Sequence, residues 1–295
     1  MLKRRIVRGA TLIIALLLAN MAVLGLAERE SREQAAAEAE KLLENVLAEN
    51  TAAETDRQKT GENRREEDLV SKTEAYPYLY ADGKVAEEEL PEKVVFLTFD
   101  DGPSRNTVKI LDALSEYNAC ATFFVIGENL TEEGIEIVKR AVAEGNMIGM
   151  HTETHQYKKI YRSTEDFLAD YDKLASRFVE LFGECPAVFR FPGGSYSMYI
   201  NSIREELREE LARRGFLGYD WNVSGDDSVG TPTAYSIKKN IFDRVYEEEQ
   251  PIILLHDSPN SNLTAEVLPE ILKKLTEEGY TFLTLQHRKP YQFPW

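Results

Sequence analysis

Carboxylate and imidazole side chains follow several short apolar runs of this 295-residue sequence. Asp100 and Asp101 end the stretch Val-Val-Phe-Leu-Thr-Phe-Asp-Asp. His151 and His155 bracket His-Thr-Glu-Thr-His, and His256 ends Ile-Ile-Leu-Leu-His. Two imidazoles one helical turn apart can bind one metal ion, and a carboxylate completes a three-ligand set that leaves a position open for water. The pattern predicts a catalytic metal site in which one aspartate is a ligand and the other is free to act as a base.

Further polar residues end other apolar runs, namely Arg190 in Arg-Phe-Pro-Gly-Gly and Asp220 before Trp221. Each stretch also has an ordinary structural interpretation. Asp-Asp-Gly-Pro-Ser, for example, is typical of a turn and helix cap. The combination is more specific, since three of the four histidines fall at predicted strand ends on one face of the fold. His287, in the C-terminal tail, is interpreted as a surface residue. The pattern differs from the His-Glu-x-x-His zinc protease motif, because Thr152 occupies the position of its glutamate.

The elements that must position these side chains are short apolar runs that alternate with amphipathic helical patterns. Predicted strands cover 93–99, 121–126, 146–150, 187–190, 217–221, 251–255 and 281–285. Predicted helices cover 105–118, 132–145, 163–182, 200–215, 234–249 and 264–279. This alternation predicts an α/β fold with a parallel sheet covered by helices, and a distorted (β/α)7-type barrel fits it best. In such a barrel the catalytic groups gather at the carboxyl ends of the strands.

The sequence is predicted to have four parts: 1–27, a membrane anchor or signal peptide; 28–91, a charged stalk and linker; 92–288, the α/β domain; and 289–295, a C-terminal tail. Basic residues precede the apolar run 10–27, so the positive-inside rule predicts a cytoplasmic N-terminus and an extracytoplasmic domain. Gly25-Leu26-Ala27 resembles a signal-peptidase site, which leaves a cleaved signal peptide and a secreted protein as the alternative. The stalk is rich in Glu, Ala, Arg and Gln and is predicted to be partly helical.

The composition excludes one class of partner. The net charge of −16 and the pI near 4.9 argue against nucleic-acid binding, which normally requires a basic face. The two cysteines, Cys120 and Cys185, do not form a metal-binding Cys-x-x-Cys pair. In an exported chain they can form one disulfide or remain two buried thiols, and the sequence leaves both alternatives open.

Five stretches together resemble the motifs of the polysaccharide deacetylases, the NodB-homology domain of carbohydrate esterase family 4. They are Thr-Phe-Asp-Asp-Gly-Pro at 98–103, His-Thr-Glu-Thr-His at 151–155, Arg-Phe-Pro-Gly-Gly at 190–194, Asp-Trp at 220–221 and Leu-Leu-His-Asp at 254–257. The resemblance covers about residues 92–288. It implies that Asp101, His151 and His155 bind a divalent metal, usually Zn²⁺, with Co²⁺ or another divalent ion as alternatives. Such a metal polarises the acetamide carbonyl and lowers the pKa of its bound water.

The resemblance also implies a division of labour among the remaining polar residues. Asp100 would be the general base and His256 the general acid that protonates the leaving amine. Arg190 would keep Asp100 ionised, because a nearby cation lowers the pKa of a carboxylate. Asp220 would orient His256 and raise its pKa, so that the imidazole is protonated near neutral pH.

The substrate side of the site is implied by the same resemblance. Trp221 and Leu254 would line the acetyl pocket, and the backbone N–H of Gly193 would hold the oxyanion. Many family members read Arg-Pro-Pro-Tyr-Gly where this chain reads Arg-Phe-Pro-Gly-Gly, so Gly193 replaces a tyrosine. This departure concerns the aromatic wall of the groove and therefore the preferred sugar chain.

The expected activity is the release of acetate from N-acetylglucosamine residues of peptidoglycan, the abundant N-acetylated polymer outside a bacterial membrane. Chitin oligomers, poly-N-acetylglucosamine and the ester acetylxylan are the alternative substrates, and a non-catalytic carbohydrate-binding relative is the alternative from another class. A serine esterase fits poorly, because Gly194-Ser195-Tyr196-Ser197 lacks the closing glycine of a nucleophile elbow.

Overall fold

The computed structural model of the chain describes residues 75–293. The predicted anchor or signal peptide 1–27 and most of the predicted stalk therefore lie outside the described residues. Within residues 75–293, no helix has the length and apolar character needed to cross a membrane.

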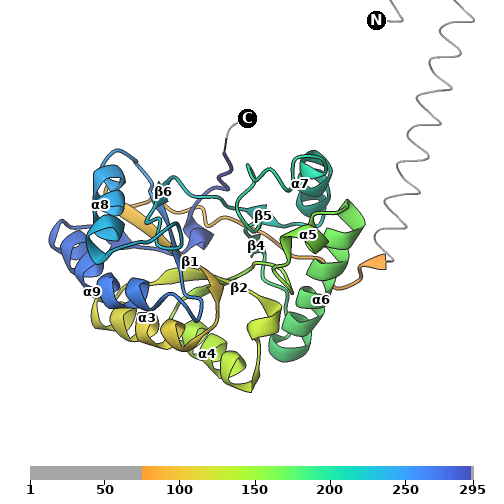
Figure 1. The fold of residues 1–295 in the computed structure, drawn as a ribbon, viewed down its shortest axis with the longest axis horizontal. Coiled ribbons are helices and arrows are strands. Elements are labelled where there is room, and N and C mark those ends of the chain that lie inside the picture. Colours follow the sequence, from red (N-terminus) through yellow and green to blue (C-terminus); the bar gives the residue numbers. More distant parts are fainter. Residues whose placement is uncertain (1–74, 294–295) are drawn as a thin grey trace, which may run out of the picture. The chain divides into compact units, whose positions relative to one another are not determined.

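A parallel sheet forms the centre of the domain (Figure 1). Its strands are β1 Val94–Gly102, β2 Ala121–Val125, β3 Met147–Met150, β4 Val188–Phe189, β5 Leu217–Gly218, β6 Val223–Ser224, β7 Ile252–His256 and β8 Thr281–Phe282. The order is β5-β4-β3-β2-β1-β7-β6, with β8 beside β1, and every pairing is parallel. The predicted distorted (β/α) barrel is confirmed, with β5 and β6 as the two ends of the sheet. Strand β6 is absent from the predicted strands, because a strand of two residues is too short to produce a recognisable apolar run.

Helices cover the sheet in two groups, α3, α4, α8 and α9 in one and α5, α6 and α7 in the other (Figure 1). Their bounds are α3 Arg105–Glu116, α4 Glu132–Ala143, α5 Tyr157–Ile160, α6 Thr164–Phe182, α7 Arg204–Arg213, α8 Ala234–Val245 and α9 Asn262–Glu277, with 3-10 turns η1 Gly127–Asn129 and η2 Leu285–His287. Ser104 and Ser163 cap α3 and α6 by accepting hydrogen bonds from the backbone of the first turn. The six predicted helices are present, and the structure adds the single turn α5 directly after the paired histidines.

Alternation along β1 determines which side chains enter the barrel. Val95, Leu97 and Phe99 pack in the core formed with α3, α8 and α9. Phe96 belongs to a second core on the opposite face of the strand. Side chains alternate between the two faces of a strand, so Asp100 shares the inner face with Phe96. The strand thus carries a nearly buried carboxylate, 4% exposed, into the barrel interior.

Both ends of the described chain pack against the barrel. In the lead-in 75–91, which the sequence pattern assigns to the linker, Leu79 is fully buried and the N–H of Ala81 donates to the carbonyl of Arg214. At the other end, Tyr291 forms a parallel bridge with Tyr219. The packed unit therefore begins before residue 92, because the apolar lead-in packs on a surface that its local sequence does not reveal.

Cys120 and Cys185 are both free thiols in this structure, so the alternative without a disulfide is the one observed.

Candidate active site

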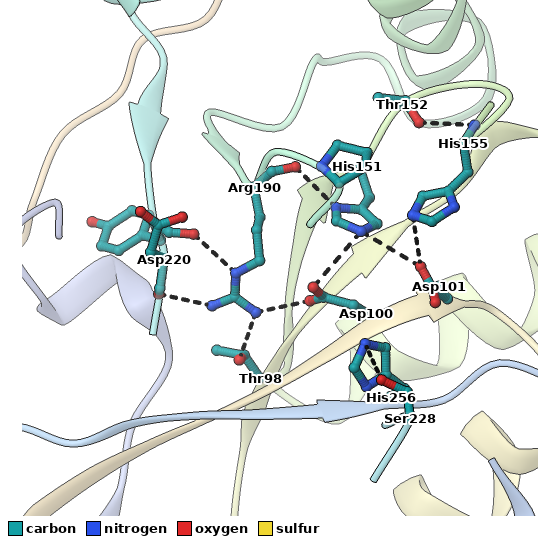
Figure 2. Close-up of polar contacts among 12 residues, drawn as sticks. Thr98, Asp100, Asp101, His151, Thr152, His155, Arg190, Asp220, Ser228 and His256 are labelled. Carbon is teal, nitrogen blue, oxygen red and sulfur yellow. Dashed lines mark hydrogen bonds and ion pairs between the residues drawn. The ribbon is translucent and has the colours of Figure 1, made fainter. Parts of the chain in front are cut away.

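Three predicted metal ligands meet at the carboxyl ends of β1 and β3 (Figure 2). Oδ1 of Asp101 lies 3.5 Å from Nε2 of His151 and 3.2 Å from Nε2 of His155. One candidate ligand atom from each residue lies within 4.8 Å of the other two. Oδ1 of Asp101 is also buried without a hydrogen-bond partner among the described residues. A buried carboxylate oxygen that faces two imidazole nitrogens is a donor set that suits a divalent cation such as Zn²⁺ or Co²⁺.

The paired histidines lie on a loop directly after β3, at the predicted strand end. Thr152 and His155 both have positive φ, 89° and 54°. The N–H of His155 donates to Oγ1 of Thr152 over 3.0 Å, which closes the turn. Asp170 on α6 accepts a hydrogen bond from the N–H of Glu153 over 2.7 Å and so fixes the loop from outside. The turn brings the two imidazole rings to a centroid separation of 5.1 Å.

Asp101 is held in an equally unusual conformation. Its φ is 76°, in the left-handed region, and the pairing of β1 with β2 is irregular at this residue, between Asp100 and Gly102. Nδ2 of Asn129, in the turn η1, donates to the carbonyl of Asp101 over 2.8 Å and so supports this backbone geometry. Asp100 and Asp101 therefore point in different directions although they are adjacent in sequence (Figure 2).

The ionisable groups of the triad shift one another's pKa values. Burial disfavours the charged form of His151, but the charges of Asp100 and Asp101 raise its pKa. Nδ1 of His151 donates to the carbonyl of Arg190 over 2.9 Å, which directs Nε2 toward Asp101. Burial disfavours the charged form of His155, and the charge of His151 does the same, so the pKa of His155 falls to about 4. Burial alone would raise the pKa of Asp101, but the charges of His151 and His155 hold that pKa well below the usual carboxyl range. Asp101 is thus ionised and His155 neutral near pH 7.

Asp100 is paired with a buried guanidinium. Nη1 of Arg190 lies 2.8 Å from Oδ1 of Asp100, and Arg190 is fully buried. The same guanidinium donates to the hydroxyl of Thr98 and to the carbonyls of Tyr219 and Asp220, at 2.8, 2.9 and 3.0 Å (Figure 2). These hydrogen bonds satisfy the donors of a charge removed from water, so Arg190 holds Asp100 in one orientation.

His256 is oriented by Asp227, and the expectation that Asp220 would do this is wrong. Nδ1 of His256 lies 2.8 Å from Oδ1 of Asp227, and Oδ2 of Asp227 accepts from the N–H of His256 over the same distance. Burial alone would lower the pKa of His256, but the hydrogen bond and charge of Asp227, with the charges of Asp100 and Asp101, raise it to about 9. The imidazole is therefore protonated near neutral pH, as expected, although a different aspartate is responsible.

Asp220 has a structural task instead. Its carboxylate accepts hydrogen bonds from the N–H and the hydroxyl of Ser195 and from the N–H of Phe293. It therefore anchors the glycine loop after β4 and the C-terminal segment. The expectation for Asp220 comes from the family resemblance, in which Asp220 lies at the end of the predicted strand 217–221. Asp227 lies in Gly-Asp-Asp-Ser after β6, which was not predicted. The sequence of this segment is typical of a polar surface loop, so it does not single out Asp227.

The metal triad, Asp100 and His256 surround one cavity of about 240 Å³. The predicted substrate residues Gly193, Trp221 and Leu254 all line it. Its wall also contains residues that the sequence motifs did not single out: Tyr157, Tyr196, Ser224, Asp226, Ser228 and Val229. All predicted site residues except Arg190 and Asp220 thus line this cavity, and Arg190 lies behind it as the partner of Asp100.

Comparison with known proteins agrees with this geometry. The family model for polysaccharide deacetylase matches residues 87–210. A peptidoglycan-N-acetylglucosamine deacetylase of Bacillus cereus is 34% identical over 195 residues, which cover 64% of this chain and 68% of the relative. The chain belongs to the polysaccharide deacetylase family of hydrolases.

Two solved structures extend the comparison. The catalytic domain of a peptidoglycan N-acetylglucosamine deacetylase from Eubacterium rectale has a TM-score of 0.65 and 29% identity, over 74% of this chain and 98% of that one. A family 4 acetyl xylan esterase from Clostridium thermocellum, in complex with a cobalt ion, has a TM-score of 0.55 and 28% identity, over 65% of this chain and 88% of that one.

Proposed function

We propose that this protein removes N-acetyl groups from N-acetylglucosamine residues of peptidoglycan in a metal-dependent hydrolysis that releases acetate. The observation that carries the proposal is the placement of an acid and a base at one level of the sheet. Asp100 on β1 and His256 on β7 are register partners, and both line the cavity that holds the metal triad. The named function of the Bacillus cereus relative supports the choice of polymer.

Asp101, His151 and His155 would hold the divalent metal. When bound, the metal supplies a Lewis acid that polarises the acetyl carbonyl and makes water a better nucleophile. Zn²⁺ is the ion that the histidine and carboxylate donors favour, and the cobalt ion of the esterase structure supports Co²⁺ as an alternative.

Asp100 acts as the general base, because Arg190 holds its Oδ1 and leaves Oδ2 available to accept a proton from the attacking water. The water oxygen bonds to the carbonyl carbon as the carbonyl π electrons move to the oxygen. His256 then gives its Nε2 proton to the sugar nitrogen as the C–N bond breaks, so acetate and a free amine leave. Asp227 keeps this imidazole protonated and oriented through Nδ1.

Gly193 contributes its backbone N–H to the developing oxyanion, while Trp221 and Leu254 enclose the acetyl methyl group. Asp220 supports this arrangement indirectly by anchoring Ser195, two residues after Gly193. The proposed substrate is an extracytoplasmic polymer. The basic residues and apolar run at 1–27 are therefore best explained as an anchor that holds the domain at the extracytoplasmic face of the cell membrane, or as a cleaved signal peptide.

The test is acetate release by the full-length protein from purified peptidoglycan, chitin pentamer and acetylxylan, measured side by side. Chelation should abolish release from peptidoglycan, and Zn²⁺ or Co²⁺ should restore it. Activity that survives complete metal removal would refute the metal site. A clear preference for acetylxylan would favour ester hydrolysis, the second candidate, which the likeness to the acetyl xylan esterase supports.

A further inference from the structure

Tyr157 lies at the metal site without belonging to any of the recognised motifs. It is the first residue of α5, and it lines the cavity beside Asp101 and His155. Its ring meets the ring of His155 edge-on, with centroids 5.2 Å apart. A second edge contact with Tyr199, at 5.3 Å, holds the ring from the solvent side. The phenol is thus fixed between a metal ligand and the outer surface.

The absence of a side chain at Gly193 makes room for this phenol. Gly193 has a φ of 77°, in the left-handed region. A Cβ atom there would lie 3.0 Å from Cε1 and 3.1 Å from the hydroxyl oxygen of Tyr157. The tyrosine hydroxyl therefore stands against the backbone of the residue whose N–H we assign to the oxyanion.

The hydroxyl of Tyr157 has no hydrogen-bond partner within residues 75–293. Three tyrosines that are buried in the core differ from the half-buried Tyr157 in this respect. The hydroxyls of Tyr161, Tyr171 and Tyr219 donate to the carbonyls of Pro192, Met150 and Arg288 at 2.9, 3.1 and 2.5 Å. A phenol in a confined polar site normally finds a partner. Tyr157 lines the cavity with Asp101, His155 and Gly193, so its unpartnered donor is available to a ligand atom there.

We infer that the Tyr157 hydroxyl donates a hydrogen bond to the acetyl oxygen of the substrate and is, beside the Gly193 N–H, a second donor to the developing oxyanion. The inference rests on the proposed function, because it assumes that the acetyl group enters this cavity. It assigns Tyr157 a catalytic role rather than a purely structural one. It also explains why a glycine at 193 is compatible with an enclosed site, since the aromatic ring reaches the same space from α5.

The kinetic test compares Tyr157→Phe, which removes only the hydroxyl, with Tyr157→Ala, which also removes the ring. Loss of one oxyanion donor lowers kcat by about a hundredfold, so Y157F should show that loss with nearly unchanged KM. Y157A should lose kcat and also raise KM. Tyr199→Phe is the matched control, because it removes a neighbouring hydroxyl that does not line the cavity, and it should keep wild-type kinetics. Wild-type kcat in Y157F would overturn the inference, even if Y157A were inactive.

A binding measurement separates this inference from the choice of polymer. Acetohydroxamate carries an acetyl oxygen and binds metals, so calorimetry with the Zn²⁺-loaded full-length protein reports on the cavity without a sugar. Y157F should bind it roughly tenfold more weakly than wild type, at equal zinc content, because one hydrogen bond to a charged oxygen is lost. Equal affinities would overturn the inference. If wild type binds acetohydroxamate but releases no acetate from any N-acetylglucosamine polymer, the proposed substrate fails while this comparison still decides the role of Tyr157.

Discussion

Asp227 and His256 form a hydrogen-bonded pair, with Oδ1 of the aspartate 2.8 Å from Nδ1 of the imidazole and the carboxylate only 1% exposed. A buried carboxylate on one ring nitrogen keeps the imidazole charged and directs the other nitrogen toward the cavity. The proton donor of the proposed reaction therefore depends on a residue in a polar loop.

Asp227→Asn should move the alkaline limb of the kcat/KM profile to lower pH. The pKa of His256 is about 9 in the wild type, so the acid is protonated below that pH and activity falls above it. Without the carboxylate, burial lowers this pKa, and activity at pH 8 should fall at least about tenfold. Asp220→Asn is the control, since it should reduce kcat through the Ser195 loop while the alkaline limb stays in place. A shifted limb in D220N alone would reverse the assignment.

The same pair should make the stability of the metal-free protein depend on pH. Folding raises the pKa of His256 from its ordinary value of 6.5 to about 9. The resulting stabilisation is fully present below pH 6.5 and is lost as the pH rises through about 9. Denaturant unfolding at several pH values should show this loss in the wild type and a flatter dependence in D227N.

Asp100→Asn and Asp101→Asn should have different effects on metal binding. In D100N the amide oxygen can still accept the hydrogen bond of Arg190, so the fold and zinc affinity should be nearly unchanged while activity falls by at least about a hundredfold. D101N replaces the proposed carboxylate ligand by a weaker one, so zinc affinity should fall about tenfold or more. Competition with a chromophoric chelator measures both affinities. If D100N lost zinc affinity and D101N kept it, Asp100 would be the ligand and Asp101 the base.

Arg190→Lys should reduce both stability and activity. A lysine keeps the charge but cannot donate simultaneously to Asp100, Thr98 and the two strand-end carbonyls. The free energy of unfolding should fall by about 2–4 kcal/mol, because buried acceptors lose their partners.

Arg214→Lys is the matched control for this variant. Arg214 is also buried and pairs with Glu210, but it contacts the lead-in 75–91 rather than the cavity. We expect a comparable loss of stability with retained kcat per folded molecule. If R190K retained wild-type kcat, the guanidinium would have a structural role only.

Gly193→Ala should reduce activity more than its effect on stability explains. A left-handed φ disfavours alanine by about 1–2 kcal/mol, and the added Cβ would push against Tyr157. Gly183→Ala is the control, because Gly183 ends α6 with a φ of 88° and open space around its missing Cβ. Thermal unfolding should show similar losses for both variants, and acetate release should fall only in G193A. If G193A and G183A released acetate at equal rates, the position of the Tyr157 ring beside Gly193 would not matter for activity.

Local sequence signals predict the parallel α/β architecture and the residues that gather at its carboxyl edge. Apolar runs and helix caps are local signals, and the strand ends of a parallel sheet meet at one edge whatever the details of packing. Asp100, Asp101, His151, Arg190 and His256 could therefore be assigned to one neighbourhood from local patterns alone.

Contacts between distant segments determine which groups face one another inside that neighbourhood. Asp220 and Asp227 are both acidic residues near the expected strand end, and the two-residue strand β6 determines which one reaches His256. Tyr157 approaches Gly193 from α5, and the lead-in packs on Arg214, through contacts between distant segments. Such contacts depend on the sum of many weak interactions across the core, and no local pattern encodes them.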